Sequence, residues 1–126
     1  MSSTVQLSFP AQTVNVALAR TVAAAMAARA DLPIDQLEDV RLAVDEAVSQ
    51  LIADALADAS VSCAFTAGEG TLEIRVSART RTGRAPATDT FSWTVMQALV
   101  DSVVATADAD EVTLDLHIAR ALPVEA

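Results

Sequence analysis

The sequence has no lysine, and its eight basic residues, all arginine, are outnumbered by seventeen acidic ones. The resulting net charge is −9. Contacts to nucleic-acid phosphates need a surface rich in basic side chains, so direct binding of nucleic acid is disfavoured. An acidic surface favours a basic protein partner, such as a DNA-binding protein, although charge of this size also serves solubility alone.

Cysteine and long apolar runs are also scarce. Cys63 is the only cysteine, which excludes an internal disulfide and a metal cluster held by cysteines, and fits a reducing compartment. The alanine-rich stretch 14–30 is interrupted by Arg20 and Arg29, so it does not read as a membrane span. The first residues lack the basic and apolar regions of a signal peptide. We therefore expect a cytoplasmic protein without membrane association.

The length and composition favour one folded domain over residues 1–126. Hydrophobic residues make up 52% of the chain, which argues against disorder. Much of this fraction is alanine, so a minority of larger side chains should build the core.

Apolar residues at helical spacing predict three helices. The first runs from about Thr13 to Arg29, with Val14, Leu18, Val22 and Met26 on one side. The second runs from about Asp35 to Leu56 and buries a stripe made of Leu37, Val40, Val44, Val48, Leu51 and Ala55. The third is expected from about Phe91 to Val104, capped by Thr90 or Ser92, after a loop over 80–90.

Alternating apolar and polar residues predict four strands, over 4–9, 60–67, 72–79 and 112–118. A hairpin turn at 68–70 joins the middle two. Strands with a single apolar face do not belong to a doubly covered parallel sheet. The fold class is therefore α+β: a two-layer sandwich of a four-stranded, mostly antiparallel sheet with three helices on one face, whose other face is solvated or covered by a partner.

Polar residues lie opposite the apolar stripe of the second helix. Asp39, Glu46, Gln50 and Asp54 fall within about 80° of one another on the helical wheel, and Glu46 and Gln50 are one turn apart. A carboxylate beside an amide oxygen can activate a hydroxyl or water and help to hold a hydrated Mg²⁺ ion. A solvated helix face is the ordinary alternative for such a pattern.

Residues 41–50, RLAVDEAVSQ, resemble the N-box of the anti-sigma-factor serine kinases of the GHKL (histidine-kinase-like) ATPase superfamily. The order of predicted elements is similar along nearly the whole chain, and residues 91–103 resemble the last helix of that family. The resemblance implies that Glu46 is the catalytic base, that Gln50 replaces the Mg²⁺-binding Asn, and that Gln50, Thr80 and Gly83 contact the cofactor. It further implies ATP and Mg²⁺ as cofactors, a sigma factor and an anti-sigma-factor antagonist as partners, and a homodimer.

The sequence departs from this family at the nucleotide site. Residues 78–82, ARTRT, lack the Asp and both glycines of the adenine-binding box. Residues 89–93, DTFSW, replace a glycine-rich box whose amides approach the phosphates, and Asp89 repels phosphate. Glutamine at position 50 shifts the amide oxygen by one methylene. These changes weigh against ATP and Mg²⁺ binding and predict a catalytically weak or inactive protein.

Several functions therefore stay open. The leading hypothesis is an anti-sigma factor that sequesters a sigma factor and is captured by an antagonist. The alternatives are an active serine/threonine kinase that uses Glu46 as its base, and a dimeric regulatory domain that binds another protein or an anion.

Six further residues have simpler interpretations. Arg79, Arg81 and Arg84 either clamp an anion or are solvated. His117 is expected on the surface and Cys63 in the core. Trp93 either fills the lost nucleotide pocket or belongs to a partner surface.

Overall fold

The computed structural model describes residues 3–121, which form five strands and three α-helices. Along the chain these are β1 (Ser3–Pro10), a short 3-10 turn (Thr13–Asn15), α1 (Val16–Arg29), α2 (Ile34–Asp54), β2 (Ser60–Gly68), β3 (Thr71–Arg79), α3 (Phe91–Leu99), β4 (Ser102–Asp108) and β5 (Glu111–Ala119).

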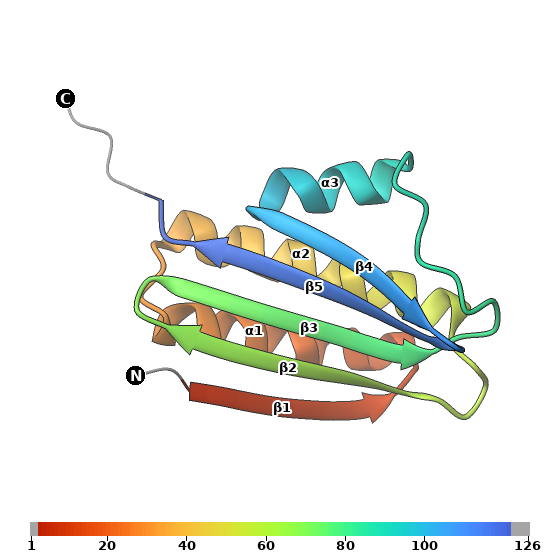
Figure 1. Ribbon diagram of the computed structural model, residues 1–126. Coiled ribbons are helices and arrows are strands. Elements are labelled where there is room, and N and C mark those ends of the chain that lie inside the picture. The colour runs from red at the N-terminus through yellow and green to blue at the C-terminus, as the bar shows by residue number, and fades with distance from the viewer. Residues whose placement is uncertain (1–2, 122–126) are drawn as a thin grey trace.

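The strands form one sheet in the order β1-β2-β3-β5-β4, and every pairing among them is antiparallel. The helices cover one face of this sheet, and the other face is open (Figure 1). The predicted two-layer α+β class is thereby confirmed, with five strands in place of the expected four.

The β2–β3 hairpin contributes the centre of the core. Val61, Cys63 and Phe65 of β2 are buried, and Cys63 is opposite Val76 of β3 in the antiparallel register. The turn places Gly70 at a φ of +73°, a conformation that glycine adopts without steric cost. Alternation therefore identified this hairpin correctly.

Helix α2 packs on the sheet through the predicted stripe. Val40, Val44 and Val48 have no exposed surface, and Leu51 is 2% exposed. None of the helices in residues 3–121 combines the length and hydropathy needed to cross a bilayer.

Helix α1 turns a different side to the core than its larger residues suggest. Val14, just before it, and Leu18 are 75% and 51% exposed, whereas Ala19, Ala23 and Ala27 are fully buried. Steps of four residues advance by about 40° around a helix, so the series from position 14 to position 26 spreads over a wide arc. Val22 is half-buried against the core, and only Met26 is fully inside it.

The prediction of a third helix up to Val104 was wrong. Helix α3 ends at Leu99, and Ser102–Asp108 form β4, which pairs only with β5 in the described sheet. On this edge strand Val103 is buried and Ala105 half-buried, so the apolar alternation is short. Val103 also continues the helical spacing of α3, which concealed the change of structure.

Candidate functional site

The polar face of α2 lies next to α3 and the loop that precedes it. Glu46, Gln50 and Asp54 are half-buried there, each within reach of a hydroxyl from the loop or from α3. Asp39 is half-buried near the start of the same helix, about two turns before Glu46. The structure therefore brings three of the four predicted polar residues to one side of a single site.

Ser92 joins Glu46 and Gln50. Its hydroxyl donates to Glu46 Oε1 at 3.0 Å, and Gln50 Nε2 donates to Ser92 Oγ. An ionised carboxylate only accepts hydrogen bonds, so the single proton of the Ser92 hydroxyl is donated to Glu46. The Ser92 oxygen can then only accept from Gln50, which therefore contacts it through the side-chain nitrogen. Gln50 Oε1 is left buried and has no hydrogen-bond partner among residues 3–121.

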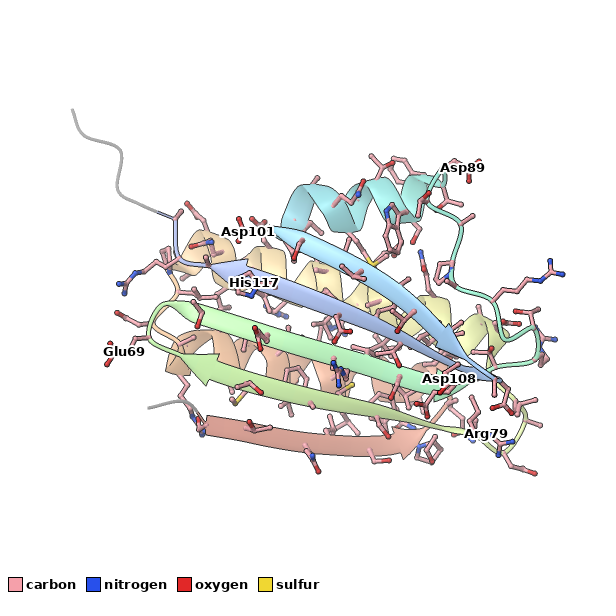
Figure 2. All side chains as sticks on the ribbon, in the orientation of Figure 1. Glu69, Arg79, Asp89, Asp101, Asp108 and His117 are labelled. Atoms are coloured by element: carbon pink, nitrogen blue, oxygen red, sulfur yellow. The ribbon has the colours of Figure 1, made fainter. Side chains whose placement is uncertain are left out.

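Helix α3 begins at Phe91, directly after its cap Thr90. Thr90 has an extended backbone, and its Oγ1 accepts from the Trp93 amide at 3.1 Å, as predicted for one of the two candidate caps. Asp89 lies at this end of α3 (Figure 2). Trp93 and Met96 anchor the helix in the core with 4% and 0% exposure.

Thr80 and Gly83 contact the β4–β5 turn. Thr80 is 2% exposed, and its Oγ1 donates to the Asp110 carbonyl at 3.2 Å while accepting from the Gly83 amide at 2.9 Å. Gly83 has a φ of +63°, and a Cβ there would stand 2.7 Å from the Ala109 carbonyl oxygen. These contacts give both residues a structural role in fixing the loop.

The three arginines do not converge on one point. Arg79 pairs with Asp110 at 2.8 Å, at the end of the sheet where β4 meets β5 (Figure 2). Arg81 donates to the Ala53 carbonyl at 3.0 Å and lies 3.7 Å from Asp54. An anion clamp made of all three is therefore not formed.

A cavity of about 360 Å³ separates α2 from the loop. It is lined by Gln50, Leu51, Ala53, Asp54, Thr80, Thr82, Arg84, Ala85, Pro86, Ala87, Thr90, Ser92 and Val112. Thr82 Oγ1 donates to Asp54 Oδ2 at 2.5 Å across one side of it. The volume is near the lower limit for ligand pockets, and Arg84 is its only lining cation.

The side chains do not fit a Mg²⁺–nucleotide complex in this arrangement. Mg²⁺ needs oxygen ligands, but Gln50 directs its nitrogen to Ser92 and its oxygen is shielded. Residues 3–121 contain no group of three or more acidic, histidine or cysteine side chains that could hold a metal ion. Gly83, the one glycine of the loop, is packed against Ala109 and offers no open backbone cradle.

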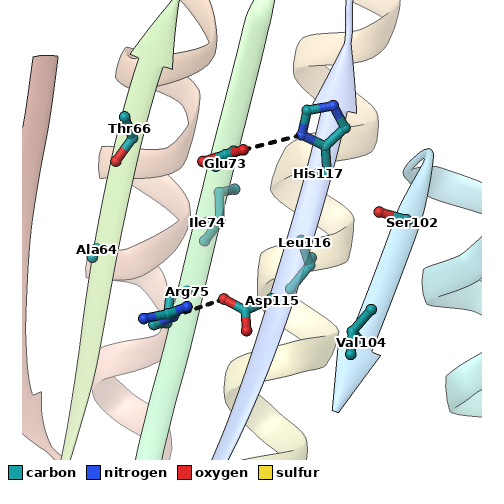
Figure 3. A pocket seen from close by; sticks show the side chains of 10 residues that line it. All are labelled: Ala64, Thr66, Glu73, Ile74, Arg75, Ser102, Val104, Asp115, Leu116 and His117. Atoms are coloured by element: carbon teal, nitrogen blue, oxygen red, sulfur yellow. Dashed lines mark hydrogen bonds and ion pairs between the residues drawn. The ribbon is translucent and has the colours of Figure 1, made fainter. Parts of the chain in front are cut away.

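A larger hollow, of about 450 Å³, lies on the open face of the sheet (Figure 3). Its charges are paired across β3 and β5: Arg75 with Asp115 at 2.8 Å, and His117 with Glu73 at 3.6 Å. His117 is at the surface, as predicted. Because small side chains such as Ala64 and Ser102 line the rest, this is a shallow surface of the sheet and not a built site.

Cys63 and Trp93 are both core residues. Cys63 is 2% exposed, and burial raises the pKa of its thiol to about 12, so it is a structural residue as expected. Trp93 is 4% exposed, which excludes a large part in a partner surface. It packs in the main core and is not part of the cavity lining.

Ser92 is the residue that the sequence did not reveal as part of the site. The sequence indicated it as a candidate helix cap and as part of the segment 89–93 that replaces a glycine-rich box, but not as a partner of Glu46, because that contact spans 46 positions and leaves no periodic signal.

Comparison with known proteins identifies the family. Residues 9–118 match the histidine kinase-like ATPase domain. The anti-sigma-F factor RsbW of Mycobacterium tuberculosis, in strains CDC 1551 / Oshkosh and ATCC 25618 / H37Rv, is 37% identical over 99 residues, which are 79% of this chain and 59% of that relative. The chain thus spans about three-fifths of the length of these curated relatives.

A solved structure has the same fold. The RsbU and RsbW domains of Rv1364c from Mycobacterium tuberculosis align with 98% of this chain and 35% of that chain, at a TM-score of 0.69 and 16% identity. At this identity the likeness concerns the fold alone. Because the family match covers most of the sequence and the observed fold agrees with it, the chain belongs to the histidine kinase-like ATPase domain family.

Proposed function

We propose that this chain is an anti-sigma factor that binds and sequesters a sigma factor, is countered by an anti-sigma-factor antagonist, and has an ATP site that no longer supports catalysis. The observation that supports the loss of catalysis is the position of Ser92. Its hydroxyl donates a hydrogen bond to Glu46, and it accepts one from the side-chain nitrogen of Gln50. The class of partner is suggested by the relatives named anti-sigma-F factor.

Charge supports a basic partner. The net charge of −9 complements the cationic surface of a protein that binds DNA, and such complementarity accelerates association at low salt. The site of action that follows from this partner is the cytoplasm, where transcription takes place in bacteria. We further propose that the chain is a homodimer, as the resemblance implies, and sedimentation velocity measures this directly.

Binding is tested with purified sigma factors from the same genome. At least one should form a complex that survives gel filtration, and its association rate should fall as salt is raised. A Glu46→Ala variant should bind as well as the wild type. If no sigma factor binds a preparation whose folding has been verified by circular dichroism, the proposal is wrong.

The alternative function is an active serine/threonine kinase that phosphorylates the antagonist. It is favoured by one feature: the half-buried Glu46 contacts Ser92, which lines the same cavity as Arg84. In that case calorimetry detects Mg²⁺-dependent ATP binding, and Glu46→Gln abolishes phosphate transfer while Glu38→Gln, an exposed change on the same helix, does not. The leading proposal predicts no binding at millimolar ATP.

A further inference from the structure

The N-terminus of α3 is tied to the middle of α2 by a serine. Ser92 Oγ donates to Glu46 Oε1 at 3.0 Å and accepts from Gln50 Nε2, and all three side chains are partly buried. Hydrogen bonds to an ionised carboxylate are stronger than those between neutral groups, and partial exclusion of water strengthens them further.

This contact has the geometry that a general base needs toward the hydroxyl group from which it removes a proton. A general base must lie about 2.6–3.2 Å from the oxygen whose proton it removes. The distance of 3.0 Å between Ser92 Oγ and Glu46 Oε1 is within that range. Ser92 therefore takes up the hydrogen-bonding position that the hydroxyl of another molecule would need at Glu46.

We propose that Ser92 is an internal substitute for an acceptor hydroxyl, and that the first turn of α3 is a latch that closes Glu46 to the hydroxyl groups of other molecules. No chemical change of Ser92 is involved. The inference goes beyond partner binding, because it rests on this contact alone and stands whatever protein the chain binds.

The first turn of α3 is buried on one side only. Trp93 and Met96 fix that side of the helix in the core, but Phe91, next to Ser92, is 83% exposed and adds no burial. Most residues of the preceding loop are also exposed. The Ser92 contact links this end to α2, whereas the Thr90 cap and the hydrogen bond from Thr94 Oγ1 to the Thr90 carbonyl close the first turn itself.

The accessibility of Glu46 tests the latch without nucleotide or partner. The full chain is treated with a water-soluble carbodiimide and glycine ethyl ester, and labelling of each carboxylate is followed by peptide mass spectrometry. In the wild type, Glu46 should react more slowly than the exposed Glu69. Ser92→Ala should raise Glu46 labelling by about tenfold or more, the effect of losing a hydrogen bond to a charged group.

Two variants serve as controls. Ser92→Thr keeps the hydroxyl and should restore slow labelling, and Ser49→Ala, an exposed change one residue before Gln50, should match the wild type. Amide exchange over residues 87–95 should accelerate in Ser92→Ala while that of α1 stays unchanged. Equal labelling of Glu46 and Glu69 in the wild type, or unchanged labelling and exchange in folded Ser92→Ala, overturns the proposal. If Ser92→Ala does not fold, the wild-type ratio and Ser92→Thr decide.

Discussion

Gly83 packs directly on Ala109, and both residues have left-handed backbone conformations, with φ of +63° and +55°. The contact holds the loop before α3 against the β4–β5 turn. This conformation favours glycine, which the chain has at position 83, whereas position 109 holds an alanine. The pair therefore allows opposite predictions.

Gly83→Ala should destabilise the protein by about 2 kcal/mol or more, because a left-handed alanine costs roughly 1–2 kcal/mol and its Cβ also meets a backbone oxygen. Gly70→Ala is the matched control: its φ is +73°, but a Cβ there would approach only the side chain of Arg120, at 3.5 Å. Urea denaturation measures both. Equal losses would show that the Ala109 contact adds nothing.

Ala109→Gly should stabilise the protein by about 0.5 kcal/mol or more, since relief of the left-handed strain exceeds the entropy that glycine loses on folding. Ala107→Gly, in the adjacent strand, should be destabilising because no strain is relieved there. Thermal unfolding of the two variants should therefore shift in opposite directions. A lower melting temperature for Ala109→Gly contradicts the prediction.

Thr90→Ala should cost about 1 kcal/mol, because it removes the side-chain acceptor for the Trp93 amide at the start of α3. Thr90→Ser keeps that acceptor and should be close to the wild type. Thr88→Ala, an exposed change in the same loop, controls for the substitution itself. Chemical denaturation and exchange of the Trp93 amide give the readouts, and a neutral Thr90→Ala would exclude the cap as a contributor.

The Cys63 thiol should make the protein less stable in alkali. Burial raises its pKa from 9.0 to about 12, so the folded state keeps a proton that the unfolded chain releases. The stabilisation is complete below the unfolded pKa and declines by about 1.4 kcal/mol per pH unit as the pH rises through this window. Denaturation of the wild type and Cys63→Ala at about pH 8 and about pH 10 isolates the effect. Rapid reaction of the native thiol at neutral pH would contradict it.

The Arg79–Asp110 pair should make the stability of the protein depend on pH in the acid range. The hydrogen bond from Arg79 is the main cause that lowers the pKa of Asp110. The stabilisation is therefore present above the unfolded pKa of the carboxyl and is lost as the pH falls through the folded one. In Arg79→Gln the carboxyl resonance of Asp110 should titrate at higher pH. Arg75→Gln, which breaks a different pair on the sheet, should leave that titration unchanged.

The sequence predicted the buried positions correctly in the elements where larger apolar residues occur only on the buried face. Alternation in β2 and β3 and the valine stripe of α2 identified the buried positions because these strands and this helix have a single dry face. The prediction failed on α1, because alanine occupies both its buried face and parts of its exposed face. Side-chain size therefore does not show which face of this helix is buried. The prediction failed again at β4, where Val103 fits helical and strand spacing alike.

The site was accessible to sequence reasoning only in part. Glu46 and Gln50 are one turn apart on a single helix, and that proximity follows from helical geometry. Ser92 reaches them from another helix, and Thr82 reaches Asp54 across a loop. Contacts of this kind depend on how α3 packs, which no local pattern encodes.

The burial of Trp93 beside Ser92 has a spectroscopic consequence. The chain has one tryptophan and no tyrosine, so its near-ultraviolet emission comes almost entirely from the residue that follows Ser92. Excitation at the indole band therefore reports on the first turn of α3 and on little else. Ligands, partners or substitutions that disturb this turn can be followed by emission in real time, with no dye attached and no second chromophore to subtract.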